Sequence, residues 1–247
     1  MTADEIWIPA NWPASEGVVA GTTLRHGGVS NGSFATLNLG AYADDDANAV
    51  CENRNRFRSI CELPSEPRWL RQVHGSNVVV DPPTGKMPEA DGAITRKSGV
   101  VCAVLTADCL PVIFAAADGA ELAVAHAGWR GLASGVLEAT VNAMSTDPAD
   151  LFAWLGPAIS QAAFEVGGEV RDQFLACDPT ADDCFAENER GRWQADLFGL
   201  ARMRLRHAGI EQVSGGEYCT FSEPERFFSY RRDGACGRMA SFVFRRI

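Results

Sequence analysis

Four short apolar runs between residues 90 and 127 constrain the fold of this 247-residue chain more than any other feature. They are ADGAIT (90–95), GVVCAVLTA (99–107), LPVIFAAA (110–117) and ELAVAHA (121–127), and turn-forming residues separate them. Apolar runs of this length that do not alternate with polar residues are typical of strands buried on both faces. The sequence therefore predicts a central sheet that is covered on both sides.

Segments on either side of these runs extend the prediction to an α/β protein. Helical spacing of apolar residues predicts helices at 46–62, 132–144, 167–176 and 193–208. Short apolar segments predict strands at 17–23, 151–156, 210–215, 227–232 and 238–246, and a strand pair at 69–75 and 77–81. Pro and Gly are spread evenly along the chain, so no linker marks a boundary and one domain is expected.

The charge balance narrows the classes of partner. The chain has 32 acidic and 22 basic residues, a net charge of −10, which argues against nonspecific nucleic-acid binding and gives no reason to expect a membrane surface as partner. No segment approaches the roughly 20 apolar residues of a spanning helix, and the first residues do not resemble a signal peptide. We therefore expect a cytoplasmic protein, and nothing in the sequence indicates a protein partner.

Cysteines and histidines are the candidates for chemistry. None of the eight cysteines forms a CxxC pair, so most are expected to be small buried residues and not disulfides. The four histidines differ in context. His207 follows an arginine-rich helical stretch, where a cation suits the helix dipole. His26 lies in a glycine-rich loop and fits either the surface or a site.

Two histidines and one cysteine share a different placement. His74 and His126 each end a predicted strand and precede a glycine, and Cys109 interrupts an apolar run beside Asp108. Ends of strands are where sites of α/β proteins gather. One thiolate and two imidazoles suit zinc and leave a fourth position for water or substrate. Their wide separation matches no local metal motif, so spacing alone leaves open that the three residues are unrelated.

Several sequence blocks, in the same order, resemble the YfiH family, which is also called the peptidoglycan editing factor or multicopper polyphenol oxidase (laccase) family. The blocks are RHGGVSNGSFATLNLG, RQVHGSNV, LTADCLPV, AHAGWRG, LGPAIS with FEVG, and then CT, FFSYRRDG and GR. The resemblance runs from about residue 17 to the C-terminus. It implies one domain over 1–247, with 1–16 as an N-terminal extension and 17–247 as the core. The implied fold is α/β (α+β), with two central mixed β-sheets flanked by helices.

The resemblance also implies a metal site and a set of activities. His74 in QVHG, Cys109 in TADC and His126 in HAGWRG match the His-Cys-His ligands of the family. Zinc is the implied cofactor, and copper is an alternative because it outranks zinc at most N/S sites. The implied function is a purine nucleoside phosphorylase acting on adenosine, inosine and methylthioadenosine, with adenosine deaminase activity. A separate family role is the removal of misincorporated L-serine from peptidoglycan precursors.

The laccase name can be tested on the histidine count. A multicopper oxidase needs a trinuclear cluster and a type 1 copper, which together use about ten histidines. This chain has four, so we do not expect polyphenol oxidation.

Five further residues are candidates for the reaction. Asp108 is the carboxylate expected either to move protons or to orient a ligand histidine. Arg130 follows the glycine turn of HAGWRG, which leads into the helix expected from 132, and would hold phosphate near a helix N-terminus. Arg25 and Arg231 stand in matching blocks, and Gln72 lies on the strand face of His74, so these three are predicted to bind substrate.

Three other functions remain possible on the sequence alone. The first is the editing amidase named above. The second is a metal-free cysteine hydrolase with Cys109 as nucleophile and His126 as base. The third is a zinc-stabilised binding module, although structural zinc usually has four protein ligands. Trp129 fits either stacking on a purine or covering the helix start.

Overall fold

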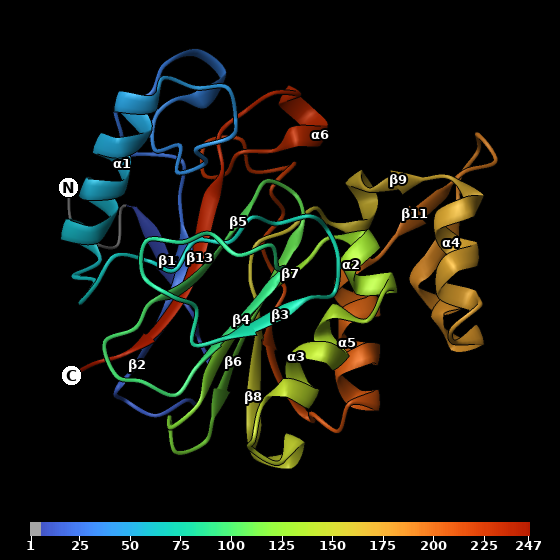
Figure 1. Ribbon diagram of the computed structural model, residues 1–247. Coiled ribbons are helices and arrows are strands. Elements are labelled where there is room, and N and C mark those ends of the chain that lie inside the picture. Colours follow the sequence, from blue (N-terminus) through green and yellow to red (C-terminus); the bar gives the residue numbers. More distant parts are fainter. Residues whose placement is uncertain (1–5) are drawn as a thin grey trace.

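Two β-sheets pack against each other at the centre of the computed structural model, which describes residues 6–247 (Figure 1). The first sheet has the order β1-β2-β13-β5, and all its neighbouring strands are antiparallel. Strand β1 lies in the segment 1–16, which was expected to be an N-terminal extension, and it pairs with β2. The strands are β1 (Trp7–Pro9), β2 (Val18–Thr23), β5 (Cys102–Thr106) and β13 (Met239–Arg245).

The second sheet is mixed and has the order β12-β8-β6-β7-β4-β3. The pairs β12–β8 and β3–β4 are parallel, and the other neighbours are antiparallel. Every residue of β6 and β7 is buried, as the unbroken apolar runs predicted. The strands are β3 (Val78–Val80), β4 (Gly92–Thr95), β6 (Leu110–Ala116), β7 (Leu122–Ala127), β8 (Leu151–Leu155) and β12 (Gln212–Gly215).

Alternating side chains of the central strands enter two different cores. Ile113 of β6 packs between the sheets with Val104 of β5 and Val243 of β13. Its neighbour Phe114 points to the opposite face and packs with the helices, including Leu205. The six-stranded sheet is therefore covered by the four-stranded sheet on one face and by helices on the other. This confirms the α+β architecture with two central sheets. The six-stranded sheet is mixed as expected, whereas the four-stranded sheet is entirely antiparallel.

Helices cover the outer faces of both sheets (Figure 1). On the four-stranded sheet, Phe57 of α1 packs edge-on against Phe242 of β13, with ring centroids 5.1 Å apart. Asp46 begins this helix by accepting hydrogen bonds from the N–H groups of Asn48 and Ala49. The α-helices are α1 (Ala47–Ile60), α2 (Trp129–Ala133), α3 (Val136–Ala143), α4 (Gly168–Leu175), α5 (Leu197–His207) and α6 (Tyr230–Asp233).

The remaining elements are short. Within residues 6–247, no helix has the length and apolar character needed to cross a membrane. Beside α4 lies a small antiparallel sheet of order β10-β11-β9, formed by β9 (Glu165–Val166), β10 (Phe185–Glu187) and β11 (Trp193–Ala195). The 3-10 helices are η2 (Gly32–Phe34), η3 (Pro148–Asp150), η4 (Gln161–Ala163) and η5 (Pro179–Cys184).

The predicted strand pair at 69–75 and 77–81 is wrong. β3 pairs with β4 in parallel, and the preceding segment makes only isolated bridges, at Arg68 and Arg71. The reason is local: His74 has a left-handed backbone with φ 61°, and the N–H groups of residues 73–75 bond to the Asp91 side chain. A carboxylate replaces the neighbouring strand as their acceptor.

Two predicted helices have different bounds. The helix expected at 132–144 begins at Trp129 and is interrupted, because Gly135 adopts a left-handed φ of 86° between α2 and α3. The helix expected at 193–208 begins only at Leu197, since Trp193–Ala195 pairs as β11. In the first case a glycine interrupts the helix, and in the second a strand pairing replaces its first turn, although the spacing of apolar residues is helical in both segments.

The strand expected at 227–232 is also wrong. Phe227 and Phe228 are fully buried, as their apolar character indicates. The Ser229 side chain then accepts a hydrogen bond from the Arg232 N–H and caps the one-turn helix α6. This turn carries Tyr230 and Arg231 to the edge of the cavity described below.

Candidate metal centre and active site

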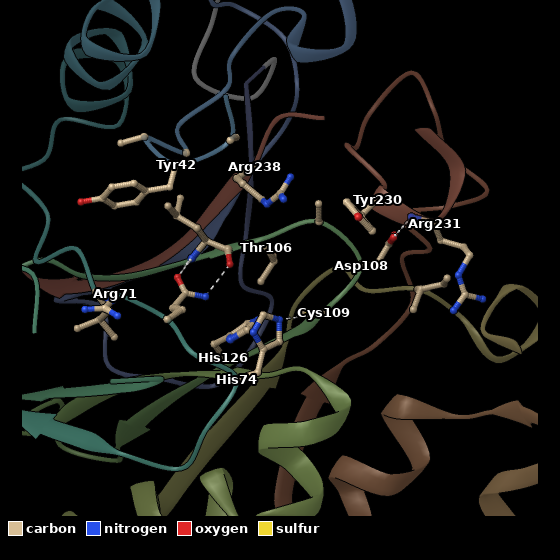
Figure 2. A pocket seen from close by; sticks show the side chains of 18 of the residues that line it. Tyr42, Arg71, His74, Thr106, Asp108, Cys109, His126, Tyr230, Arg231 and Arg238 are labelled. Atoms are coloured by element: carbon tan, nitrogen blue, oxygen red, sulfur yellow. Dashed lines mark hydrogen bonds between the residues drawn. The ribbon is translucent and has the colours of Figure 1, made fainter. Parts of the chain in front are cut away.

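The three side chains predicted as metal ligands meet at one end of the six-stranded sheet (Figure 2). His126 lies on β7, and Cys109 immediately precedes the neighbouring strand β6. Together with His74 from the loop before β3, they place one donor atom each within 4.8 Å of the other two. Cys109 Sγ lies 3.9 Å from His74 Nε2, and the two imidazole rings meet edge-on with centroids 4.8 Å apart.

Burial and mutual charge shift the titration of this cluster. His126 is buried, Cys109 is half-buried and His74 is exposed. Burial acts to raise the pKa of the Cys109 thiol, but the neighbouring imidazoles of His126 and His74 lower it to about 6. Burial acts to lower the pKa of His126, but the Cys109 sulfur and the Asp91 carboxylate raise it to about 9. Cys109 is thus favoured as the thiolate, the form in which cysteine binds metals.

A buried carboxylate that the sequence analysis did not single out contacts both histidines. Asp91 stands just before β4 and has no exposed surface. Its side chain bonds to the His126 ring at 2.8 Å and to the His74 N–H at 3.0 Å. Burial acts to raise the pKa of Asp91, but the hydrogen bonds from His126 and from nearby backbone groups lower it overall. The available signal was an aspartate inside the apolar run ADGAIT.

A cavity of about 900 Å³ lies over the three clustered side chains. Figure 2 shows Tyr42 and Arg71 on one side of it, Tyr230 and Arg231 on the other, and Arg238 between them. The end of β5 and the turn into β6, where Thr106 and Asp108 lie, form one wall, and the histidine and cysteine side chains form the floor. The cavity is therefore lined by residues from the first part, the middle and the last part of the chain.

The cavity is cationic although the chain is acidic overall. Four arginines line it, and the carboxylate in the lining is that of Asp108. The arginines are Arg54, Arg71, Arg231 and Arg238. Of these, only Arg231 was predicted. Arg71, Arg238 and Tyr230 stand in the quoted blocks RQVHGSNV, GR and FFSYRRDG, whereas Arg54 and Tyr42 stand in none of them.

Asp108 lies on the cavity wall and contacts neither histidine in a hydrogen bond. Its carboxylate accepts from the Thr220 hydroxyl at 2.6 Å and from the Arg231 backbone N–H at 2.7 Å. The Arg231 guanidinium donates to the Ala163 carbonyl at 3.4 Å. Orientation of the histidine ring, one of the two roles considered for Asp108, is provided by Asp91 in this structure.

Gln72 lines the cavity, but its amide is bonded to the backbone. Its Nε2 donates to the Leu105 carbonyl and its Oε1 accepts from the Leu105 N–H, both at 2.8 Å. This two-way pairing joins the loop that carries His74 to β5. Gln72 thus holds the wall of the cavity by its side chain.

Arg25 and Arg130 do not line the cavity. Arg25 donates to the carbonyls of Ala35 and Pro224 and stacks over Phe228. Arg130 is exposed on α2, with its guanidinium 4.4 Å from the centroid of the Trp129 ring. The helix begins three residues earlier than predicted, which carries Arg130 onto its outer side.

The other aromatic and histidine candidates lie outside the cluster. Trp129 packs against the helical core. Burial, together with the adjacent Arg25, lowers the pKa of His26. His207 is the last residue of α5, as predicted, and lies 3.3 Å from the Asp178 carboxylate.

The donor set fits a zinc-type ion. Imidazole nitrogen and thiolate sulfur are the ligands zinc prefers, and three of them leave one position for water or substrate. The hydrogen bond from His126 Nδ1 to Asp91 leaves the other ring nitrogen, Nε2, for a metal. A buried carboxylate behind a ligand histidine is a regular feature of zinc sites.

The chain matches known proteins over almost its whole length. The family model for multi-copper polyphenol oxidoreductase laccase matches residues 19–246. The purine nucleoside phosphorylase YfiH of Escherichia coli is 49% identical over 240 residues, covering 96% of this chain and 98% of the relative. A purine nucleoside phosphorylase of Pseudomonas aeruginosa is 49% identical over 239 residues, with the same coverage.

Two solved structures share the whole fold. A crystal structure of a Neisseria meningitidis protein has a TM-score of 0.94 and 45% identity, covering 98% of this chain and 99% of that one. The crystal structure of YlmD from Geobacillus stearothermophilus has a TM-score of 0.90 and 32% identity, with 98% and 97% covered.

Proposed function

Because the chain belongs to the YfiH family of laccase-type proteins, we propose that it is a purine nucleoside phosphorylase. Relatives nearly half identical over almost the whole chain carry that name. The proposed substrates are adenosine, inosine and methylthioadenosine. The observation that carries the proposal is the cationic cavity that adjoins the cluster of His74, Cys109 and His126.

Phosphorolysis requires an anion beside a sugar carbon. The bond between C1′ and the base nitrogen breaks, a phosphate oxygen bonds to C1′, and the base leaves with a proton. Arg71 and Arg231 approach the cavity from opposite sides, and Arg238 lies between them (Figure 2). Guanidinium groups bind phosphate through paired, charge-assisted hydrogen bonds. We assign these arginines to the phosphate.

The rim offers aromatic surface for a purine. Tyr42 is 81% exposed and Tyr230 is 59% exposed, and both line the cavity. Tyrosine is enriched at binding interfaces, because its ring packs on apolar surface while its hydroxyl stays in water. Their faces can stack on a planar base while the sugar lies deeper.

We assign His74, Cys109 and His126 as the ligands of zinc, with copper as an alternative metal. Zinc at three protein ligands supplies Lewis-acid chemistry and activation of water, which adenosine deamination requires. Asp108, the carboxylate of the cavity wall, is our candidate for carrying the proton in that reaction. We do not extend the proposal to polyphenol oxidation, because His26 and His207 are the only histidines of the chain beyond this cluster.

The proposal is tested by supplying inosine and adenosine to the purified protein with and without phosphate. We expect hypoxanthine or adenine together with ribose 1-phosphate only when phosphate is present, and inosine from adenosine in either case. Activity that survives complete metal removal contradicts the zinc assignment. If neither nucleoside reacts while a muramyl-L-serine nucleotide is cleaved, the editing amidase is the correct function.

A matched pair of arginine variants tests the phosphate assignment. Arg71 is 69% exposed at the cavity, whereas Arg130 is exposed outside it, so neither substitution should disturb folding. We expect Arg71→Gln to raise the KM for phosphate about 3- to 10-fold, since a partly screened charged contact is lost. Arg130→Gln should leave it unchanged. Equal effects of the two variants contradict the assignment.

A further inference from the structure

One carboxylate links the two histidine ligands through four hydrogen bonds. Asp91 Oδ1 lies 2.8 Å from His126 Nδ1 and accepts from the His74 N–H at 3.0 Å. Its Oδ2 accepts from the N–H groups of Val73 and Gly75 at 3.1 and 2.8 Å. The side chain has no contact with solvent, so water cannot replace any of these partners.

The first consequence concerns the His126 ring. A histidine whose Nδ1 donates to a carboxylate presents its Nε2 lone pair on the opposite side of the ring. The backbone reinforces this arrangement, because the His126 N–H donates to the Asp91 carbonyl at 2.7 Å. Asp91 and His126 are thus fixed to each other by main chain and side chain together.

The second consequence concerns the His74 backbone. His74 has φ 61°, a left-handed conformation that costs a non-glycine residue about 1 kcal/mol or more. Three successive N–H groups, from residues 73 to 75, converge on the same carboxylate. Such a concave group of N–H donors is an anion-binding arrangement. The Asp91 side chain occupies it and holds the loop that aims His74 at Cys109.

We propose that Asp91 is a positioning residue that arranges His74 and His126 for metal binding before the metal arrives. The inference rests on the proposed metal site. It requires a carboxylate and not merely a polar side chain of that size, because all four partners donate. An asparagine has one acceptor oxygen, and its NH₂ group opposes the remaining donors.

Asp91→Asn tests the inference, with Asp81→Asn as the matched control. Asp81 stands near the opposite end of β4, where its carboxylate contacts Thr95 and Lys97 and no proposed ligand. The measurement is zinc affinity by competition with a chromogenic chelator. We expect about a 10- to 100-fold loss for Asp91→Asn, the usual effect of removing such a partner, and no change for Asp81→Asn.

Cobalt(II) absorption gives a readout that a loss of stability alone does not move. With Co²⁺ in place of zinc, the thiolate and ligand-field bands report the geometry of bound metal. We expect these bands to shift in Asp91→Asn at saturating cobalt and to match wild type in Asp81→Asn. Wild-type bands and affinity in folded Asp91→Asn overturn the proposal.

A measurement on the wild type covers the case in which Asp91→Asn does not fold. ¹⁵N NMR of the zinc-loaded protein identifies the ring nitrogen of His126 that carries the proton. The proposal requires the proton on Nδ1 and the metal on Nε2; metal on Nδ1 overturns it. If the wild type binds no zinc, the proposed metal site fails and the role of Asp91 fails with it. If the wild type binds zinc and only the Asp91 results disagree, the metal site stands.

Discussion

Gly128→Ala is expected to damage the metal centre through a single methyl group. Gly128 precedes α2 with φ −60° and ψ 156°, a conformation that any residue adopts, so the substitution brings no backbone strain. A Cβ at this position lies 2.9 Å from Cys109 Sγ and 3.2 Å from His74 Cδ2. The added atom therefore collides with two of the three proposed ligands.

The size of the collision sets the size of the effect. Ordinary contact begins near 3.4 Å, so the Cys109 sulfur must retreat by roughly 0.5 Å. Metal–ligand distances tolerate deviations of only about 0.2 Å. We therefore expect zinc affinity to fall about 10- to 100-fold, comparable with the loss of a ligand-orienting group. The metal-free protein should lose about 1–3 kcal/mol of stability through overpacking.

Chelator competition measures the affinity and urea unfolding of the metal-free protein measures the stability. Gly168→Ala is the control, because Gly168 is the first residue of α4 and a Cβ there has no atom within 4 Å. It should retain full affinity. If Gly128→Ala binds zinc as tightly as Gly168→Ala, the close packing of Gly128 on the ligands does not matter and the reasoning is refuted.

Three side chains outside the proposed ligand set give predictions about stability. Gln72→Leu breaks both hydrogen bonds to Leu105, so urea unfolding should show a loss of about 1–3 kcal/mol, and an unchanged midpoint contradicts this. Thr106→Val removes a buried hydroxyl that has no partner among residues 6–247, so calorimetry should find the melting temperature unchanged or higher, not lower. Burial acts to raise the pKa of Asp81, but hydrogen bonds, first from Lys97, lower it overall. Its stabilisation is therefore present above the unfolded pKa of about 3.9 and is lost as pH falls through the folded value, so wild type and Asp81→Asn should converge in stability in acid.

The apolar runs predicted most strands but not how they are shared between sheets. The run at 110–117 is buried on both faces as β6, which its composition indicates directly. The preceding run at 99–107 contains β5, which pairs with β13 from the other end of the chain. The sequence of one strand does not show which distant strand it pairs with, because the pairing uses backbone N–H and C=O groups that all strands have.

The metal ligands could be predicted from the sequence, because few residue types bind a metal such as zinc. A cysteine and two histidines at strand boundaries, supported by the sequence blocks, led to the residues that meet in the structure. The arginines of the cavity were harder to predict, because the sequence does not distinguish an arginine on the open surface from one that lines a cavity. Arg130 illustrates this: its position depends on where α2 begins, and that boundary was misplaced by three residues.

Crossing between the two sheets explains why Asp108 and Cys109 face different neighbours. The chain leaves the four-stranded sheet after β5 and enters the six-stranded sheet at β6, and Asp108 has a left-handed φ of 84° at this turn. Cys109 then lies one residue before β6, whose Pro111 pairs with His126. Asp108 is turned away, toward Thr220 and the Arg231 backbone.

The carboxylate that supports His126 must therefore come from the other neighbour of β7. That neighbour is β4, in which Gly92 pairs with Ala125, so the residues just outside this pair, Asp91 and His126, are also adjacent. Sequence proximity to a ligand favoured Asp108, whereas the strand order selects Asp91. The same strand order leaves Asp108 on the cavity wall, where its carboxylate holds the backbone of a phosphate-binding candidate, Arg231. Asp91 and Asp108 thus acquire separate tasks, because Asp91 lies just before a strand that neighbours β7 and Asp108 lies at the turn between two sheets.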